Sequence, residues 1–257
     1  MNFFFGIKNK YLNCEIKVPI FKNNGEINYK LKLFSCEIND KRWLIKKLDL
    51  ETKNNFFFVK NNQIDKNKIY FLAEEKNLEI KTNENSFFFI ELKKFNNFTN
   101  TEPQYRSNLK VFNDLGFSSY QSDYPFNMIE KKGSVLSPIY PLLNSLADKN
   151  FIFFRNIYKM PIHKEFQIFF IDIEKKAVLH KEQVITNKTN EIEINKSLIN
   201  ENVYMFSDKY VGIPIFISIK DKNISMEHTH PPHHYIISKD KYHTVRNIKE
   251  KINEIIN

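Results

Sequence analysis

Residues 12–18 read Leu-Asn-Cys-Glu-Ile-Lys-Val, and residues 27–33, after the turn-like Asn23-Asn24-Gly25, read Ile-Asn-Tyr-Lys-Leu-Lys-Leu. Apolar and polar side chains alternate in both stretches, as they do in a β-strand that buries one face. The alternation therefore predicts half-buried strands. Further strand-like runs follow at 42–48, 56–59, 68–72, 78–81 and 86–92. Their spacing predicts an antiparallel, sandwich-like β block over residues 1–95.

The segment 96–150 shows no such alternation. Its prolines are Pro103, Pro125, Pro138 and Pro141. Proline lacks the backbone N–H that a strand ladder needs, and it disfavours helix in the residue before it. We therefore expect a long connecting loop here, with a short helix at 140–146. The many aromatic residues favour an ordered loop, in which Tyr120 and Tyr124 are at least partly buried.

Residues 151–257 return to strand-like runs, at 151–154, 166–173, 191–194, 203–206 and 213–219. The chain then ends on apolar residues spaced three and four apart, namely Tyr242, Val245, Ile248, Ile252, Ile255 and Ile256. This period is typical of an amphipathic helix, and Ser238 or Asp240 could serve as its N-cap. We expect the apolar stripe to dock on the second strand block. The predicted fold is thus mainly β, with two antiparallel strand-rich blocks, an ordered central loop and a C-terminal amphipathic helix.

The 257 residues carry a formal net charge of +9, from 39 Lys and Arg against 30 Asp and Glu. Such a charge attracts polyanions. The lysines are spread along the chain, however, and no Arg-rich run marks a phosphate-binding face, so nucleic acid is not the expected ligand. The sequence contains no run of about 18 apolar residues, so it predicts no membrane-spanning helix. The N-terminus lacks an export signal, so we expect a cytoplasmic protein.

The two cysteines, Cys14 and Cys36, are too few for a disulfide scaffold. Each lies in a strand-like run, where a cysteine is usually buried as a small apolar residue. We therefore expect both side chains in the core, and the sequence leaves open whether they pair with each other.

Four of the seven histidines fall within seven residues, at His228, His230, His233 and His234. If residues 223–230 form a strand, His228 and His230 share one face of it and Glu227 points to the other. The prolines at 231 and 232 would then redirect the last two histidines, giving three or four nitrogen donors for a divalent transition metal. Adjacent histidines do not easily bind one ion together, and histidines in polar loops often only hydrogen-bond. A metal site and a metal-free site are both left open.

A second group of polar and aromatic residues lies in the central segment. Flat rings can cover the apolar faces of a sugar while amide and carboxylate groups hydrogen-bond to its hydroxyls. The candidate ligand-binding residues, including one tyrosine beside the histidines, are Arg106, Tyr120, Gln121, Asp123, Tyr124 and Tyr235. A loop that covers a sheet needs similar residues to satisfy its own backbone, so anchoring of the loop is the competing interpretation.

The sequence contains no Gly-x-Ser-x-Gly elbow, no Gly-x-x-x-x-Gly-Lys phosphate loop and no Gly-x-Gly-x-x-Gly turn. Our leading interpretation is therefore a non-catalytic binding or accessory protein for a polar ligand, with a carbohydrate or a sugar-containing precursor as the first candidate. The alternative is a metal-dependent enzyme that uses the histidine cluster, with Glu227 either hydrogen-bonded to a metal-binding histidine or acting as general base. A further alternative is a structural β protein that self-assembles into a homo-oligomer through its edge strands.

Overall fold

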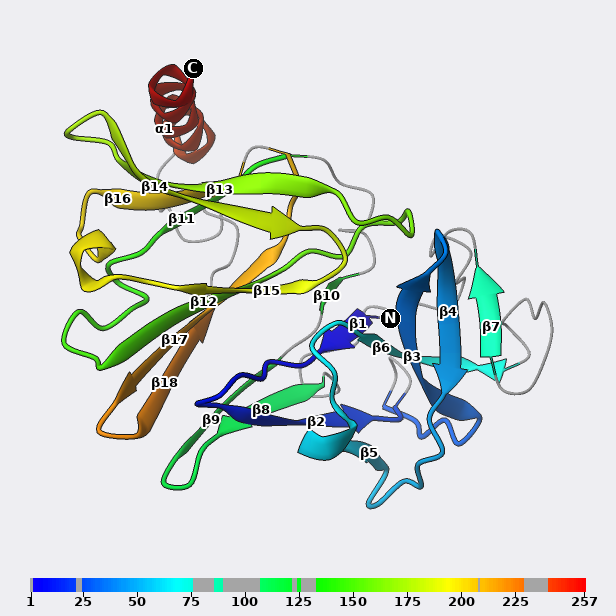
Figure 1. Ribbon diagram of the computed structural model, residues 1–257. Coiled ribbons are helices and arrows are strands. Elements are labelled where there is room, and N and C mark those ends of the chain that lie inside the picture. The colour runs from blue at the N-terminus through cyan, green and yellow to red at the C-terminus, as the bar shows by residue number, and fades with distance from the viewer. Residues whose placement is uncertain are drawn as a thin grey trace. The chain divides into compact units, whose positions relative to one another are not determined.

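The computed structural model describes residues 2–21, 25–75, 86–89, 107–121, 124–125, 133–207, 209–228 and 240–257. Within these ranges the protein is mainly β, with antiparallel sheets and one C-terminal α-helix (Figure 1). The chain divides into two compact units. Unit 1 comprises Met1–Glu130, Ile157–His163 and Asn187–Thr189, and unit 2 comprises Lys131–Asn156, Lys164–Thr186 and Asn190–Asn257.

The strands of unit 1 form two antiparallel sheets. The strands are β1 (Asn2–Phe5), β2 (Asn13–Pro19), β3 (Leu31–Asn39), β4 (Arg42–Lys47), β5 (Phe56–Val59), β6 (Ile69–Glu74), β7 (Ser86–Phe89), β8 (Asn108–Phe112), β9 (Phe117–Gln121) and β10 (Tyr124–Pro125). A six-stranded sheet has the order β10-β1-β6-β3-β4-β7, and a four-stranded sheet has the order β5-β2-β8-β9. The short 3-10 helix η1 (Asn61–Gln63) lies between β5 and β6.

The four-stranded sheet of unit 1 buries one of its faces. Cys14 and Ile16 of β2 are buried, and the residues opposite them on β8, Val111 and Leu109, are buried as well. Each of these residues is followed by one that is not fully buried. The alternation at 12–18 therefore predicted this strand and its buried face correctly.

Two short segments from the second half of the chain belong to unit 1. Asn187 connects them through three hydrogen bonds. Its Nδ2 donates to the carbonyl oxygens of Met160 (2.9 Å) and Ile162 (3.0 Å), and its Oδ1 accepts from the backbone N–H of Tyr158 (2.7 Å). These hydrogen bonds join residues that are far apart in the chain, so they leave no local pattern in the sequence.

The strands of unit 2 form a sandwich of two antiparallel four-stranded sheets. The strands are β11 (Val135–Pro138), β12 (Lys149–Arg155), β13 (Glu165–Asp172), β14 (Ala177–Ile185), β15 (Thr189–Glu193), β16 (Val203–Ser207), β17 (Ile213–Lys220) and β18 (Asn223–His228), with the 3-10 helix η6 (Lys196–Leu198) before β16. The sheet orders are β11-β16-β13-β14 and β15-β12-β17-β18. Phe166 and Phe170 of β13 share one buried cluster with Phe154 of β12 and Phe216 of β17. Both sheets therefore contribute to a single core.

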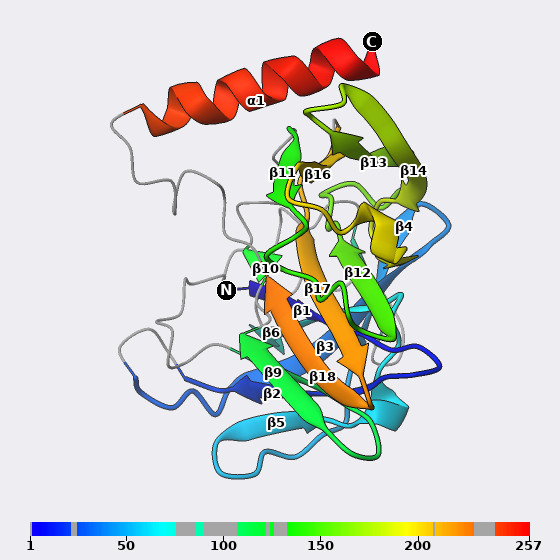
Figure 2. The ribbon, with the colours of Figure 1, turned by 90° about the vertical axis from the view of Figure 1, so that its left-hand side faces the viewer.

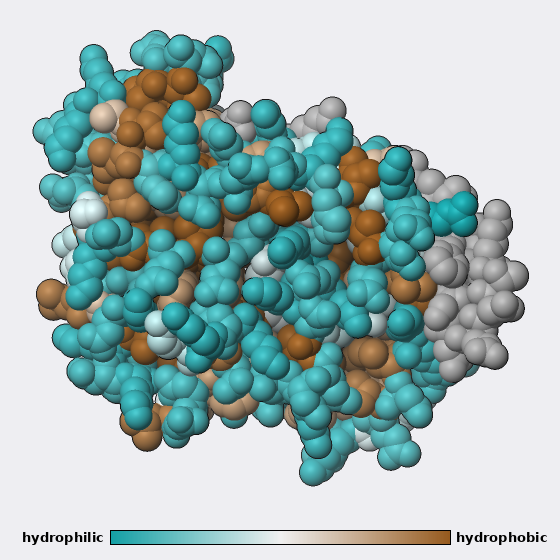
Figure 3. All heavy atoms as spheres, in the orientation of Figure 1, coloured by the Kyte–Doolittle hydropathy of each residue, from teal (hydrophilic) through white to brown (hydrophobic). Residues whose placement is uncertain are grey.

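The C-terminal helix α1 (Lys241–Ile256) lies on the outer face of the β11-β16-β13-β14 sheet (Figure 2). Ile252 is fully buried against the sheet residues Leu136, Phe169, Ile171 and Phe206. The half-buried members of the helix stripe, which flank this contact, are Val245, Ile248, Ile255 and Ile256. Apolar side chains around α1 are brown at the upper left of Figure 3. The docking that the residue spacing predicted is confirmed.

Asp240 is the N-cap of α1. It is one of the two residues that the sequence offered for this position. No helix among the described residues is long and apolar enough to cross a membrane.

Lys249 of α1 donates a hydrogen bond from Nζ to the backbone oxygen of Ser134 at 3.4 Å. Burial of this ammonium lowers the pKa of Lys249, because the charged form loses contact with water.

The central segment, expected as a loop, contains strands β8 to β11. Two of its prolines, Pro125 and Pro138, are the last residues of the edge strands β10 and β11. The end of an edge strand is one of the few strand positions that accept proline, so these residues do not interrupt the sheets. At 140–146 the chain forms turns in place of the short helix that we expected. The strand expected at 78–81 lies outside the described residues.

Cys14 and Cys36 are both buried, and no disulfide joins them. Burial raises the pKa of the Cys14 thiol from its ordinary value of 9.0 to about 12, because the apolar surroundings disfavour the thiolate. The unfolded chain therefore ionises this thiol at a lower pH than the folded chain does. Stability that Cys14 contributes is fully present below pH 9.0 and is lost as the pH rises towards 12.

We expect this ionisation to cost about 1.4 kcal/mol of stability by pH 10. The measurement is urea unfolding of the protein and of Cys14→Ala at pH 8 and at pH 10. The free energy of unfolding should fall with pH by about 1.4 kcal/mol more in the parent protein than in the variant. Equal losses in the two proteins would show that the thiol ionises in the folded state as easily as in the unfolded state.

Candidate functional site

Among the histidine cluster, only His228 lies within the described residues. It is the last residue of β18 and lies opposite Ile215 of β17. Its side chain projects from the same face of the sheet as the buried Met226, and this face is opposite the sandwich core that contains Phe216. Glu227 is exposed and alternates to the other face, as expected.

The other residues of the candidate metal site, His230, His233 and His234, lie outside the described residues. In the part of the chain that the structure describes, no group of three or more His, Cys, Asp and Glu residues is arranged to hold a metal ion. The metal site and the role of Glu227 as general base stay predictions.

The candidate ligand-binding residues of the central segment occupy different environments. Tyr124 is fully buried in unit 1, and its hydroxyl donates to the carbonyl oxygen of Ile157 at 3.4 Å, so it is a core residue. Tyr120 is half-buried, which together with Tyr124 confirms the expected burial of these rings. Gln121 is exposed. Arg106, Asp123 and Tyr235 lie outside the described residues.

Gln121 belongs to an outward-facing surface of the β5-β2-β8-β9 sheet, whose strands lie together in Figure 2. Side chains alternate along a strand, so the neighbours of the buried residues point away from the core. We call this surface the open face. Its residues are Asn13, Glu15 and Lys17 of β2, Phe56 and Phe58 of β5, Asn108, Lys110 and Phe112 of β8, and Phe117, Ser119 and Gln121 of β9.

The strand register arranges the residues of the open face, apart from Phe56, in three rows across the sheet; Phe56 lies beyond the first row, two residues from Phe58 on β5. The rows are Phe58, Lys17, Asn108 and Gln121, then Glu15, Lys110 and Ser119, and then Asn13, Phe112 and Phe117. Phenylalanines therefore occupy two diagonally opposite corners of the open face. Amide, hydroxyl and charged side chains fill the surface between these corners.

At each aromatic corner a lysine ammonium lies over two phenylalanine rings. The distances to the ring centroids are 4.0 and 5.8 Å from Lys17 Nζ to Phe56 and Phe58, and 5.2 and 5.0 Å from Lys110 Nζ to Phe112 and Phe117. Contacts of this kind contribute about 0.5–1 kcal/mol each at exposed positions. They hold the two ammonium groups beside the rings, while Phe58 and Phe117 still expose 40% and 67% of their surface.

The open face can bind a ligand that is apolar on one side and rich in hydrogen-bonding groups at its edges. The exposed rings offer flat apolar surface, and the amides of Asn108 and Gln121 offer both donors and acceptors. Lys17 and Lys110 add donors, and Glu15 adds an acceptor. Charged residues are depleted at the centre of protein–protein interfaces, so charges among the rings favour a polar ligand over a protein partner.

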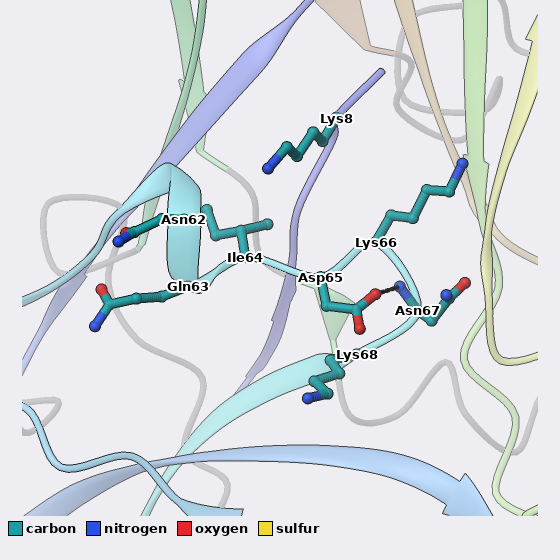
Figure 4. A pocket seen from close by; sticks show the side chains of 8 residues that line it. All are labelled: Lys8, Asn62, Gln63, Ile64, Asp65, Lys66, Asn67 and Lys68. Carbon is teal, nitrogen blue, oxygen red and sulfur yellow. Dashed lines mark hydrogen bonds between the residues drawn. The ribbon is translucent and has the colours of Figure 1, made fainter. Parts of the chain in front are cut away.

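Unit 1 also contains a shallow pocket of about 500 Å³, lined by Lys8 and residues Asn62, Gln63, Ile64, Asp65, Lys66, Asn67 and Lys68 (Figure 4). The side chains of Lys66 and Lys68 extend in different directions, so the positive charges do not meet at one point. Oδ1 of Asp65 accepts from the backbone N–H of Asn67 at 2.8 Å. The charged side chains of the pocket therefore do not converge on one ligand, and the open face is the stronger candidate site.

Sequence reasoning identified one residue of the open face, Gln121, and missed the others. The run Phe56-Phe57-Phe58 reads as core, although alternation requires at least one of these rings to point outward. That requirement was the available signal. The pairing of β2 with both β5 and β8, which brings the rings and lysines together, has no local signature. No family model matches the chain, and no curated protein or solved structure matches it either.

Proposed function

We propose that this protein is a non-catalytic binding module for carbohydrate, and that the open face is its binding surface. The observation that carries the proposal is the arrangement of phenylalanines at two corners with amides, lysines and one carboxylate between them. A sugar presents C–H groups on the faces of its ring and hydroxyls around the edge. The phenylalanine rings can cover the C–H faces, and the polar side chains can hydrogen-bond with the hydroxyls.

The exposure of the two outermost rings supports the same proposal. Phe58 and Phe117 lie on the edge strands β5 and β9, where each leaves a large part of its surface in water. Apolar surface exposed next to polar groups is a common property of binding sites. Binding of a sugar would remove this surface from water, which is the main source of affinity expected here.

The proposal predicts that Phe58→Ala combined with Phe117→Ala weakens carbohydrate binding. Removing two ring contacts is expected to cost about 1–3 kcal/mol, or roughly 5- to 150-fold in affinity. The measurement is binding of the full-length protein to a panel of immobilised polysaccharides that includes neutral and acidic polymers. The variant also loses one lysine–ring contact at each corner, so we expect its free energy of unfolding to fall by about 1–2 kcal/mol, and circular dichroism should show that it stays folded.

Tyr140→Ala is the matched control, because Tyr140 lies in unit 2 and exposes 54% of its surface. This variant should bind as the parent protein does. Absence of binding to every polysaccharide of the panel, or equal binding by the double variant, would refute the proposal. The cytoplasmic location, the homo-oligomer and the metal-dependent enzyme are separate predictions that this experiment does not address.

A further inference from the structure

The two aromatic corners of the open face are far apart. Phe58 and Phe117 lie on the outermost strands of the four-stranded sheet, separated by three strand spacings across it and by four residues along it. With about 4.8 Å between strands and about 3.3 Å per residue, their backbones are roughly 20 Å apart. This span is wider than a single sugar ring, so a ligand that reaches both corners must be a chain.

A lysine accompanies each corner. Lys17 and Lys110 each lie within 6 Å of two ring centroids, at 4.0 and 5.8 Å and at 5.2 and 5.0 Å. A ring contact restricts where the ammonium can go, so less side-chain freedom is lost when a ligand binds it. Each corner thus offers one flat apolar surface and one positioned positive charge.

We propose that the open face binds an acidic polysaccharide, with one acidic sugar at each aromatic corner; this inference rests on the proposed function. A carboxylate on the sugar accepts a charge-assisted hydrogen bond from the ammonium, which is roughly twice as strong as a bond between neutral groups. The net charge of +9 favours the approach of such a polymer.

Glu15 distinguishes an acidic polysaccharide from single-stranded nucleic acid. It lies directly opposite Lys110, between the two corners, and is the single acidic residue of the open face. A nucleic acid strand would place phosphates along this path, where the carboxylate repels them. A polysaccharide has hydroxyls between its acidic groups, and a carboxylate accepts hydrogen bonds from hydroxyls.

The test uses the full-length protein with three soluble probes: polygalacturonate, which carries one carboxylate per sugar, neutral dextran, and oligo(dT). The variant Lys17→Met/Lys110→Met removes both charges and keeps the length and apolar character of the side chains. Lys181→Met is the matched control, because Lys181 also lies over a phenylalanine ring, 5.5 Å from the centroid of Phe169, but in unit 2. Lys17→Arg/Lys110→Arg keeps the charges.

We expect the protein to bind polygalacturonate, with an affinity that falls as salt is raised. The double methionine variant should lose about tenfold or more in affinity, since hydrogen bonds to charged groups are the stronger class. The Lys181 variant and the double arginine variant should bind like the parent. Circular dichroism and thermal unfolding check that each variant is folded.

The contradicting outcomes are distinct. If dextran binds as tightly as polygalacturonate and the methionine variant binds both normally, the acidic ligand is refuted and the carbohydrate module stands. If oligo(dT) binds more tightly than either polysaccharide, the acidic polysaccharide and the carbohydrate module are both refuted in favour of nucleic acid. If no probe binds, the acidic polysaccharide is refuted, and the polysaccharide panel decides the proposed function separately.

Discussion

Asn187→Ala is expected to destabilise unit 1 by about 3–5 kcal/mol, the largest effect that we predict for a single substitution. The variant loses the two hydrogen bonds that Asn187 donates to Met160 and Ile162 and the one that it accepts from Tyr158. Each backbone group left without its partner costs about 1 kcal/mol or more. Asn187 also has a φ of 60°, a conformation that asparagine tolerates and alanine adopts only at a cost of about 1–2 kcal/mol.

Two further variants separate these contributions. Asn187→Gly accepts the positive φ but forms none of the hydrogen bonds, so it should be about 1 kcal/mol less destabilising than alanine. Asn187→Asp keeps the acceptor for the N–H of Tyr158 and loses both donors. Urea unfolding measures the three free energies. A loss below about 1 kcal/mol in all three variants would show that these hydrogen bonds do not hold the two segments together.

Ile252→Ala is expected to lower the stability of unit 2 by about 2–5 kcal/mol, the usual range for removing a large aliphatic side chain from a packed site. Ile252 of α1 is fully buried, and it packs on Leu136, Phe169, Ile171 and Phe206. Alanine would leave a cavity between the helix and the sheet. The expected result is a lower thermal midpoint and a lower urea midpoint with an unchanged denaturant slope.

The control for this substitution is the adjacent position of the same helix. Lys251→Ala changes an exposed residue and slightly favours helix, so it should leave the midpoint within about 0.5 kcal/mol of the parent. If Ile252→Ala instead keeps the midpoint and abolishes self-association, then α1 is an interaction element. That outcome would favour the self-assembling β protein over the binding module.

The alternation of residue types was sufficient to predict most of the strands and the helix. In β2 and β8 the buried residues alternate with polar ones, and the stripe of α1 follows the 3.6-residue period. The edge strand β14 was missed. Its residues Leu179, His180 and Lys181 are all exposed, and an edge strand with little buried surface has almost no apolar pattern.

Tight turns were hard to predict because the chain has only 5 glycines. The hairpins between β3 and β4 and between β17 and β18 turn at Asp40-Lys41 and Asp221-Lys222, and all four residues have positive φ. Two consecutive residues of positive φ form the turn that best fits the twist of a hairpin. Glycine or asparagine usually marks such turns, and an Asp-Lys pair does not.

The candidate site depended on contacts that no local pattern encodes. Sequence reasoning left Tyr124 as either a ligand-binding or an anchoring residue, because a tyrosine among polar residues is compatible with both roles. The structure buries this ring and exposes Phe58 and Phe117, which belong to strands at opposite edges of one sheet. Which side of a strand faces water depends on what packs on the other side.

The sequence by itself determined that the protein is mainly β, that residues 12–18 form a half-buried strand, and that the chain ends in an amphipathic helix. These properties follow from the period of the apolar residues, which is a local property of the chain. Only the tertiary structure decided which strands pair, which segments belong to unit 1, and that two Lys–Phe corners share one face of a sheet. Strand pairing joins residues that are far apart in the chain, and its hydrogen bonds are made by the backbone, which is the same for nearly every residue type.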